Sequence, residues 1–320
     1  MIRTPHAVFV LATACTLLGA CTQTAPVSTQ TSTQTSETHT SSTASNADSS
    51  VAALANGILV IEPSSGDLLR YSSGGWEVVY DGLSYDAEVE GDAAYVESAF
   101  SASGETFAAL CCEPFSGIFG KVVAGEIEYS GYGTRPTLLG ENIVAFVDIY
   151  DEQLSTKLTL SPLSAPQEVL SESVLTGVAA HSIRLQPLSK NRVAFTWSPS
   201  VEGAPWYLAV LDLSQPKLYD EEVLLRLSVE LTGAADIALV LDSSDRIAVF
   251  SQNSTPSLEF YSQSTAGSLP RSGKVAELPA GTSAVLIDGN ATAYLLADGV
   301  SVSDGSEELL LPGSFTWMGR

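Results

Sequence analysis

Short apolar segments recur along this chain at intervals close to fifty residues, and this spacing constrains the fold more than any other feature of the sequence. Each segment runs from a polar residue or glycine, through apolar and small residues, to an aromatic residue or valine. The five segments are residues 91–95, 142–146, 191–195, 245–249 and 290–294. Because such segments are typical of strands, the repeat predicts small sheets packed side by side rather than a two-layer sandwich.

A second repeat has the same period and indicates a hairpin. Residues 62–66 and 113–117 both read Glu-Pro-X-Ser-Gly, and each follows an apolar stretch, at 58–61 and 107–112 respectively. Proline and glycine favour a tight turn, so each copy predicts a strand, a turn and a second strand.

These runs resemble the strand-turn-strand hairpins of β-propellers, although they match no single propeller family. The resemblance covers residues 51–320 and implies an all-β fold with six blades, within a range of five to seven. In the first unit, the strand equivalent to the one at Tyr95 would fall near residue 44, so the first blade lacks its first strand. Residues 314–317 echo residues 194–197, which predicts that the C-terminal strand completes that blade and closes the ring.

Three local patterns complete the expected fold. Residues 223–231 alternate between apolar and polar side chains, which favours a strand over a helix. The dipeptide Asp304-Gly305 separates two apolar stretches and predicts a hairpin with a type I′ turn. Only residues 166–173 are expected to hold a helical turn.

The N-terminus has the layout of an export signal. Residues 1–6 include Arg3, and the apolar run at 7–20 is too short to span a bilayer. The run ends in Leu18-Gly19-Ala20-Cys21, which resembles the lipobox of bacterial lipoproteins. The resemblance implies cleavage before Cys21 and attachment of lipid, including acyl chains such as palmitate, to Cys21. An ordinary signal peptide that happens to contain a cysteine is the alternative.

The segment after the lipobox is expected to be a disordered tether. More than half of residues 22–50 are serine or threonine, and none is aromatic. Such a segment cannot bury enough apolar surface to offset the entropy of ordering. The sequence therefore predicts a signal peptide at 1–21, a tether at 22–50 and a propeller-like domain at 51–320.

The charge balance excludes one class of partner and locates the acidity. The chain has 37 acidic and 14 basic residues, which gives a net charge of -23. This excess argues against nucleic-acid binding, because neutralising phosphates requires lysine and arginine. All but two of the acidic residues follow residue 50, so the body is acidic and would approach anionic headgroups poorly. A tether separates such a body from the membrane.

Few residues suit catalysis. After the signal peptide only His39 and His181 remain, and no Gly-X-Ser-X-Gly motif is present, so a serine triad and a histidine zinc site are not expected. No phosphate-binding loop or dinucleotide fingerprint occurs, and we expect no cofactor and no metal.

Cys111 and Cys112 are the only cysteines of the predicted body. They align with the apolar residues Val60 and Ile61 of the preceding unit, which favours ordinary strand thiols. A vicinal disulfide in an oxidising compartment is the second interpretation, although adjacent Cα atoms lie closer than in most disulfides. A redox or metal role is the third.

The most ordered acidic cluster is Asp86, Glu88, Glu90 and Asp92. Spacing by two would place these four carboxylates on one face of a strand, as a candidate binding face for Ca²⁺ or a basic partner. None of the acidic clusters has the spacing of a calcium loop. A solvated, solubilising role is the simpler interpretation.

Together these features predict an extracytoplasmic lipoprotein, anchored to the cell membrane and facing the cell surface or the periplasm. We expect a monomeric, non-catalytic propeller that binds a protein or a glycan of the envelope. The alternative is a surface hydrolase of glycans, which requires two carboxylates to face each other across the channel.

Overall fold

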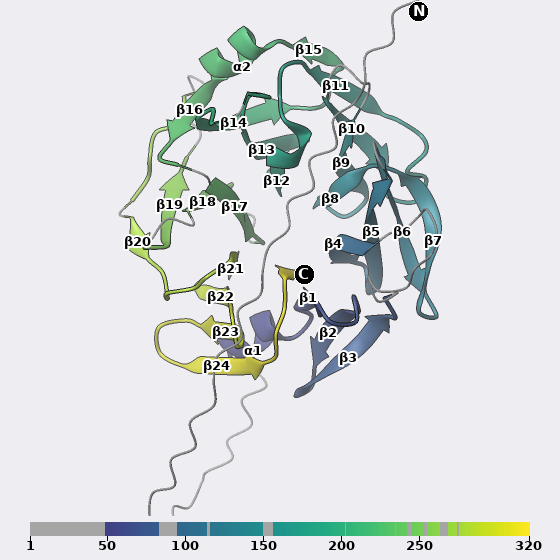
Figure 1. Ribbon diagram of the computed structural model, residues 1–320, viewed down its shortest axis with the longest axis vertical. Helices are drawn as coiled ribbons and strands as arrows, with labels where there is room; N and C mark the ends of the chain where they lie inside the picture. The colour runs from purple at the N-terminus through teal and green to yellow at the C-terminus, as the bar shows by residue number, and fades with distance from the viewer. Residues whose placement is uncertain are drawn as a thin grey trace, which may run out of the picture. The chain divides into compact units, whose positions relative to one another are not determined.

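Small antiparallel sheets are arranged around a central channel in the computed structural model, as six blades (Figure 1). The structure describes residues 49–82, 95–113, 116–149, 156–201, 203–233, 235–241, 245–251, 255–262, 268–273 and 275–320. These residues belong to one unit, Ser45–Arg320. Within them, the predicted all-β propeller is confirmed.

Each blade has four strands, with the innermost strand on the channel. From the channel outward, blade one consists of β25 (Trp317–Gly319), β1 (Leu59–Ile61), β2 (Leu68–Ser72) and β3 (Gly75–Tyr80). Blade two consists of β4 (Tyr95–Ala102), β5 (Glu105–Glu113), β6 (Ser116–Val123) and β7 (Glu126–Tyr132). Blade three consists of β8 (Thr134–Leu139), β9 (Ile143–Ile149), β10 (Thr156–Pro162) and β11 (Ser171–Leu175). Blade four consists of β12 (Arg184–Pro187), β13 (Arg192–Trp197), β14 (Trp206–Asp212) and β16 (Ser228–Leu231). Blade five consists of β17 (Ala235–Val240), β18 (Ile247–Ser251), β19 (Ser257–Tyr261) and β20 (Ala276–Glu277). Blade six consists of β21 (Ala284–Asp288), β22 (Ala291–Leu296), β23 (Gly299–Ser303) and β24 (Glu308–Pro312).

The C-terminal strand closes the ring. β25 pairs antiparallel with β1, and Met318 lies opposite Val60. Blade one therefore takes its innermost strand from the end of the chain and its other three from the beginning, as the missing first strand predicted.

The hydrophobic core is divided among the contacts between neighbouring blades. Six clusters of buried side chains occur in the described residues, and each joins one pair of adjacent blades. The cluster between blades six and one also takes up Val51 and Leu54 of helix α1 (Ser50–Ala55). Arg320 reinforces this closure, because its Nη1 pairs with Asp288 and its Nη2 donates to the Ala53 carbonyl.

The fifty-residue repeat marks the second strand of a blade. Four of the five predicted segments coincide with β9, β13, β18 and β22, which are buried between two strands of the same sheet and two neighbouring blades. Of the fifth segment, 91–95, only Tyr95 is described; it lies on a strand as predicted, but that strand is β4, an innermost strand rather than a second one. In blade two the equivalent second strand is β5, where Phe107 and Ala108 are buried.

The strand predicted at 223–231 is wrong in its first half. Helix α2 (Glu221–Leu227) occupies it, and only β16 is a strand. The Asp220 side chain caps the helix by accepting a hydrogen bond from the Val223 N–H at 2.8 Å. The negative charges of Glu221 and Glu222 in the first turn stabilise the positive end of the helix dipole. Before α2, strand β15 (Lys217–Tyr219) pairs in parallel with β11 and so links blade four to blade three.

The predicted turns are confirmed as hairpins, but one turn type is wrong. Residues 62–66 join β1 to β2, and the Gly66 N–H donates to the Glu62 carbonyl at 2.8 Å. The β23–β24 hairpin exists, yet only Gly305 has a positive φ, so its turn is not type I′. Asp304 Oδ1 instead accepts from the N–H groups of Ser306 and Glu307. Residues 166–173 contain no helix: Pro166 and Gln167 form a single turn, closed by the Glu168 N–H on the Ala165 carbonyl at 2.8 Å, and β11 begins at Ser171.

Candidate functional site

The central channel holds a cavity of about 760 Å³. The innermost strands of all six blades line it, namely β4, β8, β12, β17, β21 and β25. Any residue that points inward from one of these strands therefore meets residues from other blades, and the channel is where distant parts of the sequence converge.

Four charged residues from consecutive blades form an arc along the channel wall. Glu97, Arg135, Arg184 and Asp236 come from β4, β8, β12 and β17, and each lies within the first three residues of its strand. We call these four residues the charged arc. Its order is negative, positive, positive, negative.

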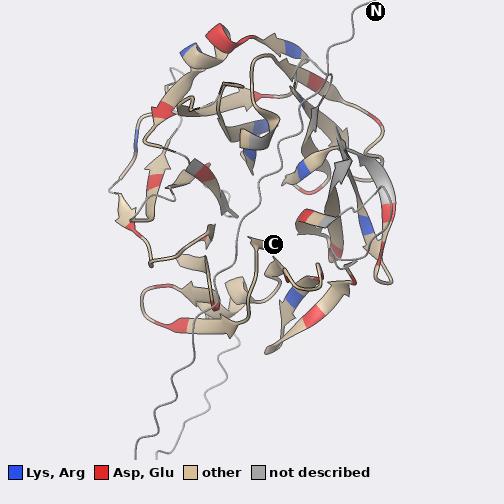
Figure 2. Ribbon diagram, viewed as in Figure 1, with Lys and Arg blue, Asp and Glu red and all other residues tan. Residues whose placement is uncertain are grey.

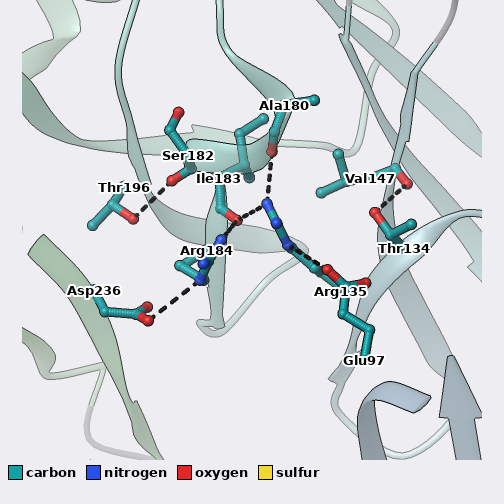
Figure 3. A network of polar contacts seen from close by, with 10 residues as sticks. All are labelled: Glu97, Thr134, Arg135, Val147, Ala180, Ser182, Ile183, Arg184, Thr196 and Asp236. Carbon is teal, nitrogen blue, oxygen red and sulfur yellow. Dashed lines mark hydrogen bonds and ion pairs between the residues drawn. The ribbon is translucent and has the colours of Figure 1, made fainter. Parts of the chain in front are cut away.

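The arc is held together by direct contacts between blades (Figure 3). Arg135 Nε lies 3.0 Å from Glu97 Oε1, and Arg184 Nε lies 3.3 Å from Asp236 Oδ2. Arg135 Nη1 donates to the carbonyls of Ala180 at 2.6 Å and Ile183 at 2.8 Å. Arg184 Nη1 donates to the same Ile183 carbonyl at 3.0 Å. The two guanidinium groups therefore meet at one carbonyl oxygen.

Two β-bulges set the direction of the Glu97 and Arg135 side chains. The pairing of β4 with β5 shifts register between Val96 and Ser98, so Glu97 is the inserted residue. The pairing of β8 with β9 shifts between Thr134 and Thr137, and Arg135 in this bulge has a φ of 51°. Positive φ is uncommon for a residue with a side chain, and bulges redirect side chains near functional sites.

The carbonyls of the arc are positioned by the short 3₁₀ helix η2 (Ala180–Ser182). Ser182 is fully buried; its Oγ donates to the Ala179 carbonyl at 2.6 Å and accepts from the Ser198 N–H at 2.8 Å. These bonds tie η2 to the residue after β13. His181 lies in η2, and its side chain is outside the description.

Two positive charges, those of Arg135 and Arg184, lie next to each other at the centre of the arc. Burial lowers the pKa of Arg135, the positive charge of Arg184 lowers it further, and the pairing with Glu97 opposes both effects. Two like charges are thus held side by side, while the neutralising carboxylates lie at the two ends.

The described charged residues that line the cavity have a net charge of zero, whereas the chain as a whole is strongly acidic. Arg135, Arg184 and Arg320 line it together with Glu97, Asp236 and Asp245. Among the described residues, three positive and three negative groups therefore face the channel, inside a chain of net charge -23. Figure 2 shows both signs on the strands beside the channel.

Asp245, a member of the cavity lining, has a structural role. It accepts from the Ser189 N–H at 2.7 Å and the Ser189 hydroxyl at 2.6 Å, and it pairs with Arg192 at 2.7 Å. Burial on its own raises the pKa of Asp245, but the bonds from Ser189 and Arg192 outweigh burial and hold that pKa below its ordinary value. The residue joins blade five to blade four.

None of the described residues that line this site was predicted from the sequence as a site residue. Cys21, Asp86, Glu88, Glu90 and Asp92 lie outside the described residues. Cys111 and Cys112 belong to β5, where the pairing with β6 shifts register between Leu110 and Glu113. The side chains of the two cysteines are not described, so their vicinal disulfide stays a prediction.

Sequence reasoning missed all four residues of the arc. The available signal was their spacing, because 97, 135, 184 and 236 are separated by roughly one blade each. Within the described ranges, no three histidine, cysteine or acidic side chains lie together as metal ligands. In the same part of the chain, no helix has the length and apolar character needed to cross a bilayer.

No family model and no curated protein matches this chain. Solved structures that resemble it include SapL1 lectin in complex with alpha methyl fucoside, at 10% identity, with 81% of this chain and 96% of that chain covered and a TM-score of 0.49. The β-propeller domain of the Trilobed protease from Pyrococcus furiosus is 10% identical, with 69% and 86% covered and a TM-score of 0.42. Acylaminoacyl peptidase from Pyrococcus horikoshii is 8% identical over 69% of this chain, with a TM-score of 0.45, and this chain covers only 46% of it. These likenesses concern the fold alone.

Proposed function

We propose that this protein is a membrane-anchored envelope lipoprotein whose propeller is a non-catalytic binding module for a protein or glycan partner. The ligand group enters the central channel and contacts the charged arc. The observation that carries this proposal is a cavity, lined from six blades, whose described charged residues balance within a strongly acidic chain.

The size and lining of the cavity support a binding role. A volume of about 760 Å³ lies within the usual range of small-molecule sites. Such sites combine apolar walls with a few convergent polar groups, and here Trp317 and Leu138 line the same cavity as the arc. The bulges at Glu97 and Arg135 are irregularities that a purely structural ring does not require.

The arc gives less support to the hydrolase alternative. A glycosidase needs one carboxyl group that protonates the leaving oxygen and a second one across the scissile bond. Glu97 and Asp236 each contact a guanidinium, and both guanidinium groups lie between them in the arc. The carboxylates are thus engaged in ion pairs rather than facing a common point.

The anchor is tested at Cys21. Replacing Cys21 with serine removes the thiol that accepts the lipid, so we expect the full chain to move from the membrane fraction to the soluble fraction of exported protein. Lipid chains contribute about 0.8 kcal/mol per buried methylene, and the substitution removes this contribution. Immunoblots of fractionated cells and labelling with radioactive palmitate measure the change. Unchanged, carbonate-resistant membrane association of Cys21→Ser would contradict lipid anchoring.

The channel is tested by photo-crosslinking in cells. A benzoyl-phenylalanine residue at Leu138, which lines the cavity, is expected to form an adduct with the ligand on irradiation. The same residue at Val78, exposed on the outer strand β3, serves as the matched control. An adduct of equal yield at Val78, or none at Leu138, would argue against binding in the channel.

A further inference from the structure

Positive charge is concentrated at the centre of the charged arc, and Arg135 does not use all of its N–H groups there. Arg135 and Arg184 both donate to the carbonyl of Ile183, so their charges lie against each other. A guanidinium has five N–H groups, and Arg135 uses three of them through Nε and Nη1. Its Nη2 donates to no described residue.

The exposures of the two ion pairs show where a ligand can reach. The side chains of Arg135 and Glu97 are 18% and 19% exposed, whereas those of Arg184 and Asp236 are 37% and 35% exposed. Arg184 and Asp236 therefore form the more accessible part of the arc, and Arg135 and Glu97 form the more buried part of the same cavity wall. An anionic group at the centre of the arc would meet Arg184 first.

The carboxylates at the two ends of the arc can accept hydrogen bonds from donor groups of a ligand. Glu97 Oε2 is buried and has no hydrogen-bond partner among the described residues. Such an acceptor normally has a partner, because an unsatisfied buried polar atom costs about 1–3 kcal/mol. At the other end Asp236 is a second acceptor. A matching ligand thus carries an oxyanion with donor groups on both sides of it.

Other residues that line the cavity restrict further the class of ligand that fits it. Ser98 and Ser101 line the same cavity, and their hydroxyls have no hydrogen-bond partner among the described residues, so they can bond hydroxyl groups of a ligand, while Trp317 offers an apolar surface. A sugar acid carries its carboxylate on a ring rich in hydroxyls, whereas an amino acid has a donor on one side only. A basic ligand would meet two guanidinium groups at the centre.

We propose that the charged arc binds an acidic sugar, with the carboxylate at Arg135 and Arg184 and ring hydroxyls at Glu97 and Asp236. This inference rests on the proposed channel function and specifies the class of its ligand. Charge-assisted hydrogen bonds from the two guanidinium groups to the carboxylate supply both the affinity and the orientation.

The test is isothermal titration of the full chain in detergent with D-glucuronate, D-glucose and glycine as probes. We expect D-glucuronate to bind at least tenfold more tightly than D-glucose or glycine. Arg184→Gln should weaken D-glucuronate binding at least tenfold, and Arg184→Lys should weaken it less, because lysine keeps the charge but loses the fork. Arg271→Gln is the matched control, since Arg271 also pairs with a carboxylate, that of Glu259, and neither residue lines the cavity.

Several results would overturn the inference. Equal affinity for D-glucuronate and D-glucose would remove the role of the carboxylate, and stronger binding of glycine would replace the sugar with an amino acid. Unchanged D-glucuronate binding by Arg184→Gln would place the site elsewhere. If no probe binds while the Leu138 adduct still forms in cells, the ligand class is wrong and the channel proposal stands. Circular dichroism of each variant verifies that the propeller is folded.

Discussion

Deleting residues 314–320 is expected to abolish cooperative folding of the whole propeller. The deletion removes β25, so β1 loses its partner on the channel side and exposes an unpaired strand edge. It also removes Met318 and Trp317 from the two clusters that join blade one to blades six and two. Because each blade is stabilised mainly by its neighbours, an opened ring loses support on both sides. Urea denaturation followed by tryptophan fluorescence should show no cooperative transition.

A point substitution gives a graded form of the same test. Met318 is 6% exposed, and Met318→Ala should lower the free energy of unfolding by about 2–4 kcal/mol. Leu310 on the neighbouring blade is 52% exposed, and Leu310→Ala should change that free energy by less than about 0.5 kcal/mol. If the deleted protein unfolds at the urea midpoint of the full chain, closure by β25 does not stabilise the ring.

The blades could be predicted because their strongest sequence signal comes from the most buried strands. Val193, Ala194 and Phe195 of β13 are all fully buried, and β18 carries the equivalent Ile247 and Ala248. A strand covered on both faces has to be apolar throughout, so it repeats visibly even when the rest of the blade diverges. Closure was predictable for a related reason, since a missing first strand requires a replacement.

The failures have local physical causes. At 223–231 the alternation of apolar and polar residues matched a strand, but the cap at Asp220 and the acidic first turn favour a helix over Glu221–Leu227. At Asp304 the side chain satisfies the turn by itself, so no second positive φ is needed. Periodicity averages over several residues, and these outcomes depend on single hydrogen bonds.

The charged arc could not be predicted because much of it is backbone. The carbonyls of Ala180 and Ile183 carry no sequence signal, yet they hold both guanidinium groups. Arg135 precedes Pro136, which disfavours helical backbone conformations, and its positive φ follows from a bulge that depends on the register of β8 with β9. Only the spacing of one charged residue per blade was visible in advance.

The buried half of the arc should show strong energetic coupling. Removing one partner of a buried ion pair leaves the other charge without compensation, so Arg135→Gln is expected to lower the free energy of unfolding by about 3 kcal/mol. Glu97→Gln should cost less, because Arg135 keeps its bonds to two carbonyls. The double variant should be more stable than the sum of the single effects implies, with a coupling energy of about 1–3 kcal/mol. Urea denaturation of the four proteins measures this cycle.

The exposed pair Glu222–Arg226 is the control for this cycle. Its side chains are 84% and 68% exposed and its closest atoms are 3.9 Å apart, so the same glutamine substitutions should give a coupling energy below about 0.5 kcal/mol. The contrast follows from burial, since water screens the helix pair and is largely excluded from the pair in the channel wall. Additive effects of Glu97→Gln and Arg135→Gln would show that the two residues do not support each other, and the bulges would then need another explanation.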